Sequence, residues 1–190
     1  KERLRPRMAQ TATVLWGVYI LLTLAETLLL FLGGMTPFDA LCHAFGTMAT
    51  GGFSTRNASI GAYGSDFIDW TVTVFMFLAG VNFILHYRAL FYRDAATLRD
   101  NRELRFYVVV ILLGVAVTMG FLLLQGIAPA EEIMRRYRNR PLTGDALEEA
   151  IGTAAFHLRS VYHVFRYAVF QVVSITTTTG YVTTDFDLWP

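Results

Sequence analysis

The chain has few charged residues and a single cysteine. Of its 190 residues, 16% are Asp, Glu, Lys or Arg, against the roughly 25% that is usual in soluble domains, whereas 54% are hydrophobic. Cys42 alone excludes an internal disulfide framework and a zinc site built on several cysteines. A formal net charge of +1, with no cluster of basic and aromatic residues, gives no indication of nucleic-acid binding. The composition therefore predicts a protein that lies in a lipid bilayer.

Three apolar stretches are long enough to cross that bilayer. They cover Thr11–Leu32, Phe67–Leu90 and Phe106–Ile127, and each is close to the about 20 residues that a spanning helix needs. Two shorter apolar stretches, Phe38–Ala49 and Tyr162–Ile175, are typical of re-entrant segments or buried core helices. A signal peptide is the weaker interpretation of the basic amino end, because the first run is too long for a signal core and no small-residue cleavage site follows it.

A short glycine-containing loop occurs twice, each time after one of the two shorter apolar stretches. Residues 47–55 read TMATGGFST, and residues 176–184 read TTTTGYVTT. At a constant offset of 128 residues, Gly52 aligns with Gly180, and the neighbouring threonines and aromatic residues align as well. Two turns between packed helices would be the ordinary interpretation of such glycines. Their duplication at equivalent positions favours a pair of matched pore loops instead.

The order of span, short helix, glycine loop and span occurs once in full and once in part. We expect a complete pore repeat over residues 1–93, a cytoplasmic linker over 94–105, and an incomplete second repeat over 106–190 with an outer insert at 128–158. Arginines between residues 88 and 105 place the linker inside, because short loops rich in Lys and Arg stay cytoplasmic. Internal repeats are common in membrane transporters. Since the second repeat lacks its outgoing helix, we expect a piece of a longer protein.

The two loops have the chemistry of a cation site. A non-helical segment at membrane depth is tolerated only inside protein or along a water-filled cavity. Gly51, Gly52 and Gly180 permit positive φ, so successive carbonyls can face one way and replace the hydration shell of K⁺. Each short helix ends at its loop and directs its negative dipole end toward the ion. We expect Phe53 and Tyr181 to brace the loops from behind.

Specific runs of residues carry a family resemblance. Residues 34–45 (GMTPFDALCHAF), with 49–55 (ATGGFST) and 59–61 (SIG), resemble the third pore repeat of the Trk/Ktr/HKT superfamily of potassium transporters. Residues 171–180, with those at 183–186 and 188–190, are similar to the fourth pore loop of the Trk-type membrane subunit. The resemblance implies an all-α membrane protein made of four potassium-channel-like helix–pore-loop–helix repeats around a pseudo-fourfold axis. Each repeat would supply one quarter of a filter.

By position, the resemblance assigns K⁺-binding main-chain carbonyls to eight residues of this chain. They are Thr50, Gly51, Gly52, Phe53, Thr178, Thr179, Gly180 and Tyr181. Both loops depart from the Thr-Val-Gly-Tyr-Gly potassium filter, because each has one equivalent central glycine and no final glycine. The resemblance also implies several partners: the remaining repeats of the same protein, a cytosolic nucleotide-binding regulatory subunit, and a second copy in a homodimer. By the same resemblance, the protein would be located in the bacterial inner (plasma) membrane.

Polar and small residues interrupt the predicted spans. Gly80, Val81 and Asn82 lie within the second span; the ordinary interpretation is a close helix contact with Asn82 bonded to a neighbour. In the resembled family the corresponding helix is broken by a loop that obstructs the pore, which makes these three residues the gate candidates. Glu26 is costly in lipid and is expected to bond to a pore helix rather than to bind ions.

Two histidines also receive positions from the sequence. We expect His43 to pack behind the filter, and His86 to face water or headgroups near the cytoplasmic end. A metal site would need further ligands converging on a histidine, and none is evident from the sequence.

Potassium uptake is the leading functional hypothesis. A less selective Na⁺/K⁺ pathway and a non-transporting membrane scaffold with two re-entrant hairpins remain as alternatives. An enzyme is disfavoured, because the sequence has no nucleophile–base pair, no HExxH motif and no phosphate-binding P-loop. K⁺ is thus expected as the transported ion, and no organic cofactor is expected on this chain.

Overall fold

The structure is a computed structural model that describes residues 4–92, 100–124 and 161–184. Within these ranges every regular element is a helix, which confirms the predicted all-α class. The elements are α1 (Leu4–Leu32), α2 (Pro37–Met48), the short 3₁₀ helix η1 (Ser59–Tyr63), α3 (Asp66–Ala79), α4 (Phe83–Tyr92), α6 (Arg102–Leu124) and α9 (Val161–Thr176). The outer insert at 128–158, linker residues 94–99 and motif residues 185–190 lie outside the described residues.

Two of the predicted spans are single helices, and the third is broken. Ala12–Leu32 within α1, and α6, are each long and apolar enough to cross a membrane. The predicted span Phe67–Leu90 is instead divided between α3 and α4. The chain bends by 104° between these two helices. Up to three crossings result if this bent pair counts as one span. The two shorter apolar stretches form α2 and α9, as predicted.

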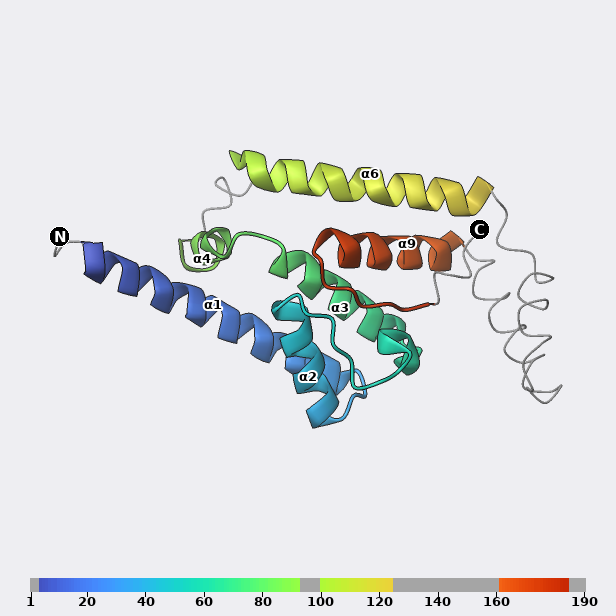
Figure 1. The fold of residues 1–190 in the computed structure, drawn as a ribbon, viewed down its shortest axis with the longest axis horizontal. Coiled ribbons are helices and arrows are strands. Elements are labelled where there is room, and N and C mark those ends of the chain that lie inside the picture. Colours follow the sequence, from blue (N-terminus) through green and yellow to red (C-terminus); the bar gives the residue numbers. More distant parts are fainter. Residues whose placement is uncertain (1–3, 93–99, 125–160, 185–190) are drawn as a thin grey trace.

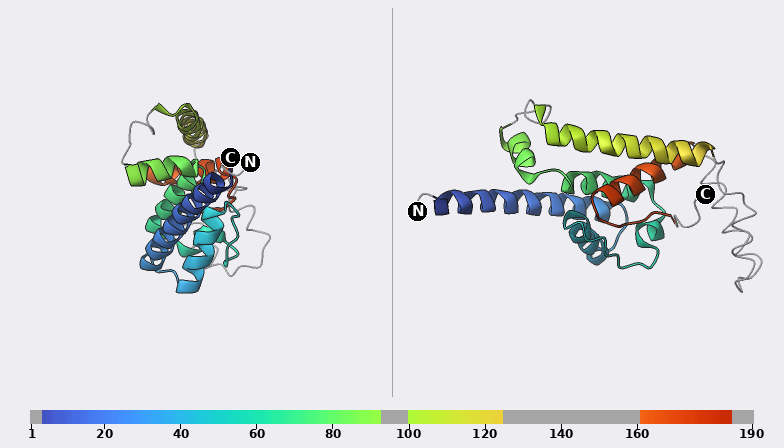
Figure 2. Two further views of the ribbon diagram at one scale, coloured as in Figure 1. Left: turned by 90° about the vertical axis from the view of Figure 1, so that its left-hand side faces the viewer. Right: turned by 45° about the horizontal axis from the view of Figure 1, so that its top comes forward.

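Two long helices flank the shorter ones (Figure 1). α1 packs against α2, α3 and α4, whereas α6 packs against α9. α3 connects these two groups of helices, because it contacts both α2 and α9. The end-on view in Figure 2 places α6 on one side and α1 with α2 on the other. The two short helices are therefore held against one central helix.

A shared apolar core and a buried ion pair connect the repeats. Leu30 and Met76 of the first repeat are fully buried in one cluster with Phe170 and Tyr181 of the second. Arg166, on α9, is almost completely buried and places Nη1 against the carboxylates of two acidic residues of α3, Asp69 and Asp66. Because a buried cation is costly without a partner, this pairing fixes which faces of α3 and α9 meet.

The exposed faces of the long helices are apolar. Trp16, Leu24 and Leu32 on α1 are well exposed, as are Leu112 and Leu124 on α6. Contiguous apolar surface of this extent would be unfavourable in water. It suits contact with lipid or with further membrane-embedded protein.

Candidate ion filter

The loops that follow α2 and α9 have the same backbone structure. Four backbone hydrogen bonds of the first loop recur in the second, each shifted by 128 residues. With their N···O distances, the matched pairs are Ala49 N to Phe45 O (2.9 Å) and Thr177 N to Val173 O (2.9 Å); Thr50 N to Thr47 O (3.0 Å) and Thr178 N to Ile175 O (3.0 Å); Gly51 N to Gly46 O (2.8 Å) and Thr179 N to Ser174 O (2.9 Å); Gly52 N to Gly46 O (3.2 Å) and Gly180 N to Ser174 O (3.4 Å). The duplication seen in the sequence is therefore a duplication of structure.

Backbone torsions repeat in the same way. Thr50 and Thr178 have φ of 51° and 60°, and Gly52 and Gly180 have φ of 64° and 86°. A threonine in the left-handed region costs about 1–3 kcal/mol and persists only where the surroundings enforce it. Gly51 would permit positive φ but does not adopt it, because Thr50 makes the turn one residue earlier. The glycine content alone gave no signal for this strained threonine.

The hydrogen bonds determine where the loop carbonyls point. All described peptide bonds are trans, so the N–H of one residue and the C=O of the residue before it point in opposite directions. Gly51 and Gly52 direct their N–H groups back to Gly46 O at the end of α2. The carbonyls of Thr50 and Gly51 therefore point away from α2. By the same reasoning, the carbonyls of Thr178 and Thr179 point away from α9.

Tyr181 braces the loops, as predicted. Its side chain is fully buried, with its ring 5.8 Å from that of His43. The hydroxyl lies 3.1 Å from Phe53 O and 3.2 Å from His43 O, and so donates to this pair of carbonyls. A Cβ on Gly46 would collide with the hydroxyl, which explains the glycine on α2. The second loop thus packs onto the pore helix of the first.

Phe53 does not brace a loop within the described residues. It occupies the position equivalent to Tyr181, yet it is 84% exposed. Tyr181 reaches the pore helix of the preceding repeat, and the described part of the chain contains no pore helix before α2 for Phe53 to reach. The prediction for Phe53 is therefore wrong for this part of the protein.

The carbonyls of the two aromatic residues are held by hydroxyl groups. Phe53 O accepts from Tyr181, and Tyr181 O accepts from Ser174 Oγ at 2.7 Å. The two loops also touch directly, because a Cβ on Gly52 would collide with the carbonyl of Thr179. This close contact makes the two loops neighbouring parts of one site.

Asp39 on α2 anchors the outer part of the first loop. Its carboxylate accepts from Thr55 Oγ1 at 2.6 Å and from Arg56 Nη2 at 3.0 Å. These contacts, chiefly the hydrogen bond from Thr55, lower the pKa of Asp39 to about 2. This anchor was not predicted from the sequence. The available signal was an acidic residue one helical turn before His43 on the same short helix.

His43 packs behind the first loop, as predicted. Its Nδ1 donates to Asp39 O at 2.7 Å, which leaves Nε2 to accept from Ser54 Oγ at 2.9 Å. Burial lowers the pKa of His43, so the neutral imidazole fits this arrangement. No group of three or more His, Cys, Asp or Glu that could hold a metal occurs among the residues that the structure describes.

The gate candidates lie at the break between α3 and α4. Asn82 caps α4 by accepting from Ile84 N at 3.0 Å, so the expected bond from Asn82 to a neighbouring helix is replaced by a cap on its own helix. His86 is buried and donates from Nε2 to Leu78 O at 2.8 Å. The expectation that His86 faces water or headgroups is therefore wrong, because the broken helix leaves a carbonyl for it to bind.

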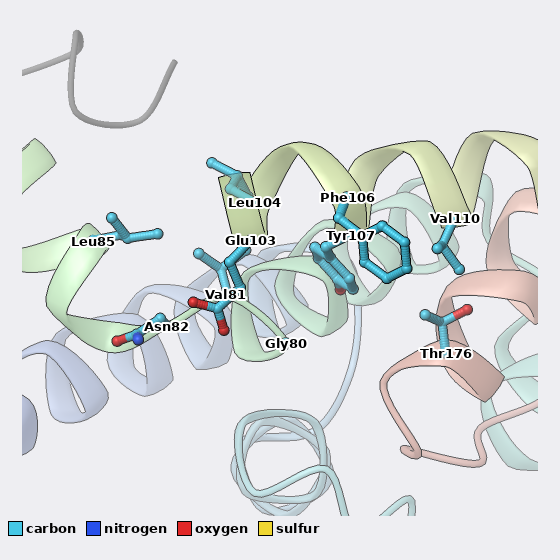
Figure 3. A pocket seen from close by; sticks show the side chains of 10 residues that line it. All are labelled: Gly80, Val81, Asn82, Leu85, Glu103, Leu104, Phe106, Tyr107, Val110 and Thr176. Carbon is cyan, nitrogen blue, oxygen red and sulfur yellow. The ribbon is translucent and has the colours of Figure 1, made fainter. Parts of the chain in front are cut away.

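A cavity of about 240 Å³ lies beside this break (Figure 3). Gly80, Val81 and Asn82 line it from the break, Tyr107 and Val110 from α6, and Thr176 from the end of α9. The break therefore shares this cavity with the carboxyl end of α9, the helix that leads into the second loop.

Glu26 is completely buried on α1. Thr47 of α2 is beside it, but the Thr47 hydroxyl donates to His43 O at 2.8 Å. Neither carboxyl oxygen of Glu26 has a hydrogen-bond partner within the described ranges. Glu26 therefore meets the pore helix at Thr47, as expected, but without a hydrogen bond of ordinary geometry.

Comparison with known proteins places the chain among cation transporters. The model of the TrkH family, described as cation transport protein, matches residues 2–190. The Trk system potassium uptake proteins TrkH of Vibrio parahaemolyticus and of Escherichia coli are 34% and 33% identical to it, over 99% and 100% of the chain. TrkG of Escherichia coli is 37% identical over 63% of the chain and 24% of its own length.

A solved structure agrees with these matches. The crystal structure of the potassium transporter TrkH from Vibrio parahaemolyticus superposes with a TM-score of 0.74 at 34% identity. The superposed region covers 97% of this chain and 34% of the transporter chain. The present chain spans about a third (33%) of the length of the two TrkH proteins.

Proposed function

Because the chain belongs to the TrkH family of cation transport proteins, we propose that it forms part of a potassium uptake protein and supplies two quarters of its ion filter. As a member of this family it is an integral, multi-pass protein of the bacterial inner membrane. The transported ion is K⁺, because the relatives are named potassium uptake proteins. The protein acts as a transporter and not as an enzyme, and needs no organic cofactor on this chain.

The observation that supports this proposal is the matched direction of the loop carbonyls. Thr50 and Gly51 in one loop, and Thr178 and Thr179 in the other, direct their carbonyls away from their pore helices. Rows of carbonyls aimed into one space can replace the hydration shell of K⁺. The carbonyls of Gly52 and Gly180 continue these rows. The carbonyls of Phe53 and Tyr181 instead turn back toward the pore helices, where they accept from the Tyr181 and Ser174 hydroxyls, so they would not join these rows.

The remaining parts of the assembly follow from the same proposal. Further repeats of the same protein complete the filter, and Gly80, Val81 and Asn82 form the gate below it. Residues 1–93 are the complete repeat, 94–105 the cytoplasmic linker, and 106–190 the incomplete repeat. A cytosolic nucleotide-binding regulatory subunit meets the cytoplasmic side, and two copies of the protein form a dimer. The word "system" in the relatives' names supports the presence of other components.

The test is K⁺ uptake by the full-length protein, against Na⁺ competition, in cells that lack other potassium uptake. Gly52→Ser introduces a Cβ that collides with Thr179, and Gly180→Ser imposes a side chain at φ of 86°. Both should relax selectivity or alter flux at matched membrane expression. Gly64→Ser is the control, because Gly64 also has positive φ but lies outside both loops, with open space for a Cβ. If transport is unchanged in both loop variants, these loops are not the filter.

The same experiment separates the alternatives. Strong Na⁺ competition in the native protein would indicate the less selective Na⁺/K⁺ pathway. A scaffold without transport would show no K⁺ uptake, and the two loop substitutions would alter only its stability.

A further inference from the structure

The break between α3 and α4 leaves carbonyl groups without their normal helical partners. In an intact helix, the carbonyls of Phe77 and Leu78 would accept from the N–H groups of residues 81 and 82. The chain turns away at Gly80, so that Val81 N bonds to Leu78 O instead, at 3.1 Å. At membrane depth, a carbonyl left without any donor costs several kcal/mol. The Phe77 carbonyl therefore needs another donor, and the Leu78 carbonyl, which accepts from Val81 N alone, can take a second one.

Two side chains supply those donors. The Tyr107 hydroxyl, on α6, donates to Phe77 O at 3.2 Å, and its ring stacks on that of Phe77 at 5.2 Å between centroids. His86, on α4, donates from Nε2 to Leu78 O at 2.8 Å. Figure 3 shows Tyr107 beside the break, where a Cβ on Gly80 would collide with its hydroxyl.

We infer that Tyr107 and His86 are positioning residues that hold the span in its bent form and thereby set how often the gate opens. This inference rests on the proposed function. In the bent span, the two side chains bond to the carbonyls of Phe77 and Leu78. In a straight span, the N–H groups of Val81 and Asn82 would bond to the same two carbonyls. Either form satisfies both carbonyls. Loss of the Tyr107 hydroxyl takes the side-chain donor from Phe77 O, and loss of the His86 donor leaves Leu78 O with Val81 N alone, so both changes favour the straight form and the first does so more strongly.

The second filter loop touches the same point. A Cβ on Gly80 would lie 3.0 Å from Thr177 Cγ2, and the Thr177 hydroxyl lies 2.8 Å from that of Thr179. Straightening of the span moves Gly80 relative to Thr177. The bent span therefore supports the base of the loop as well as closing the path beneath it.

The test measures the bend between α3 and α4 and the K⁺ flux separately in the full-length protein. Spin labels at Val74→Cys and Ile84→Cys, two exposed positions on either side of the break, report the bend as a distance distribution in a cysteine-free background. Basal K⁺ flux into proteoliposomes reports opening. Tyr107→Phe removes only the hydroxyl, and should raise the straight population and basal flux by about two- to tenfold, the effect of one net hydrogen bond.

His86 provides a second, independent variant. His86→Leu should act in the same direction as Tyr107→Phe, whereas His86→Gln keeps an N–H donor and should restore the native distribution. Tyr162→Phe is the matched control, because Tyr162 bonds to Trp70 Nε1 at 3.1 Å, away from the break. An unchanged distance distribution in both Tyr107→Phe and His86→Leu would overturn the inference. Native protein that bends as described but conducts no K⁺ would instead refute the proposed function.

Discussion

Among single residues, Asp39 attaches the outer part of the first loop to α2. Its carboxylate holds Thr55 and Arg56, and its pKa of about 2 lies below the ordinary value for aspartate. A carboxyl with a lowered pKa stabilises the folded protein at pH values above its unfolded pKa of about 3.9, and this contribution is lost as the pH falls through about 2. The attachment is therefore complete at any pH above about 4.

Asp39→Asn should weaken this attachment by a constant amount between pH 5 and 8, because the native carboxylate is ionised throughout that range. We expect lower thermal stability and reduced K⁺ uptake at both ends of the range. Thermal unfolding of the purified full-length protein at pH 5 and pH 8, with uptake measured in parallel, checks this. A difference between variant and native protein that disappears at pH 5 would contradict the assigned pKa.

Gly46 and Tyr181 form a pair that can be tested by a double-mutant cycle. Gly46→Ala forces a Cβ into the Tyr181 hydroxyl, and such overpacking costs typically about 1–3 kcal/mol. Tyr181→Phe removes the hydroxyl together with its bonds to Phe53 O and His43 O. The double variant should lose less stability than the sum of the two single variants, because the collision is gone. Additive losses in thermal unfolding would show that the two groups are not in contact.

At the scale of helices, α3 and α9 are held together by charge. Arg166→Met would leave the buried carboxylate of Asp69 without its cation, which costs about 3–5 kcal/mol. The double variant Arg166→Met with Asp69→Leu removes both buried charges, leaves only the half-exposed Asp66 without its partner, and should recover most of that loss. Thermal unfolding in detergent of the native protein and the single and double variants measures this. If the double variant is as unstable as the single one, the pair contributes through something other than its charges.

The sequence predicted most helices from hydropathy, and the interruption at residues 80–82 from its small and polar residues together with the family resemblance. α1, α2, α6 and α9 were found from the length of their apolar runs, because bilayer thickness sets how long such a run must be. The break at Gly80 lies within one continuous apolar run, so hydropathy gave no signal for it; the family resemblance did. The partners of Tyr107 and His86 could not be predicted, since they exist only once α3 is broken and α6 is packed nearby.

Similar limits apply to the two loops. Their duplication was visible because equivalent residues recur at one offset. The strained Thr50 and Thr178 were not predictable, because threonine ordinarily avoids positive φ and tertiary contacts enforce it here. The different surroundings of Tyr181 and Phe53 depend on which neighbouring pore helix is present, and that information lies outside each loop.

On the scale of the whole molecule, the exposed Phe53 predicts a contact with the rest of the protein. Its backbone is equivalent to that of Tyr181, which is buried on the preceding pore helix. In the full-length protein we expect Phe53 to be buried on another pore helix in the same manner. A cysteine at position 53 should then react slowly with a membrane-impermeant thiol reagent, whereas one at the exposed Asn57 should react fast. Equal, fast labelling at both positions would contradict this packing.

The hydrogen bond from Tyr181 to Phe53 also has a consequence for biosynthesis. The two residues are 128 positions apart, so the first loop leaves the ribosome long before the hydroxyl that holds its carbonyl. At about 5–20 residues per second, the delay is roughly 6–26 s. During that time the nascent first loop lacks one of its fixed contacts. Completion of this part of the ion path is therefore timed by translation of the later repeat.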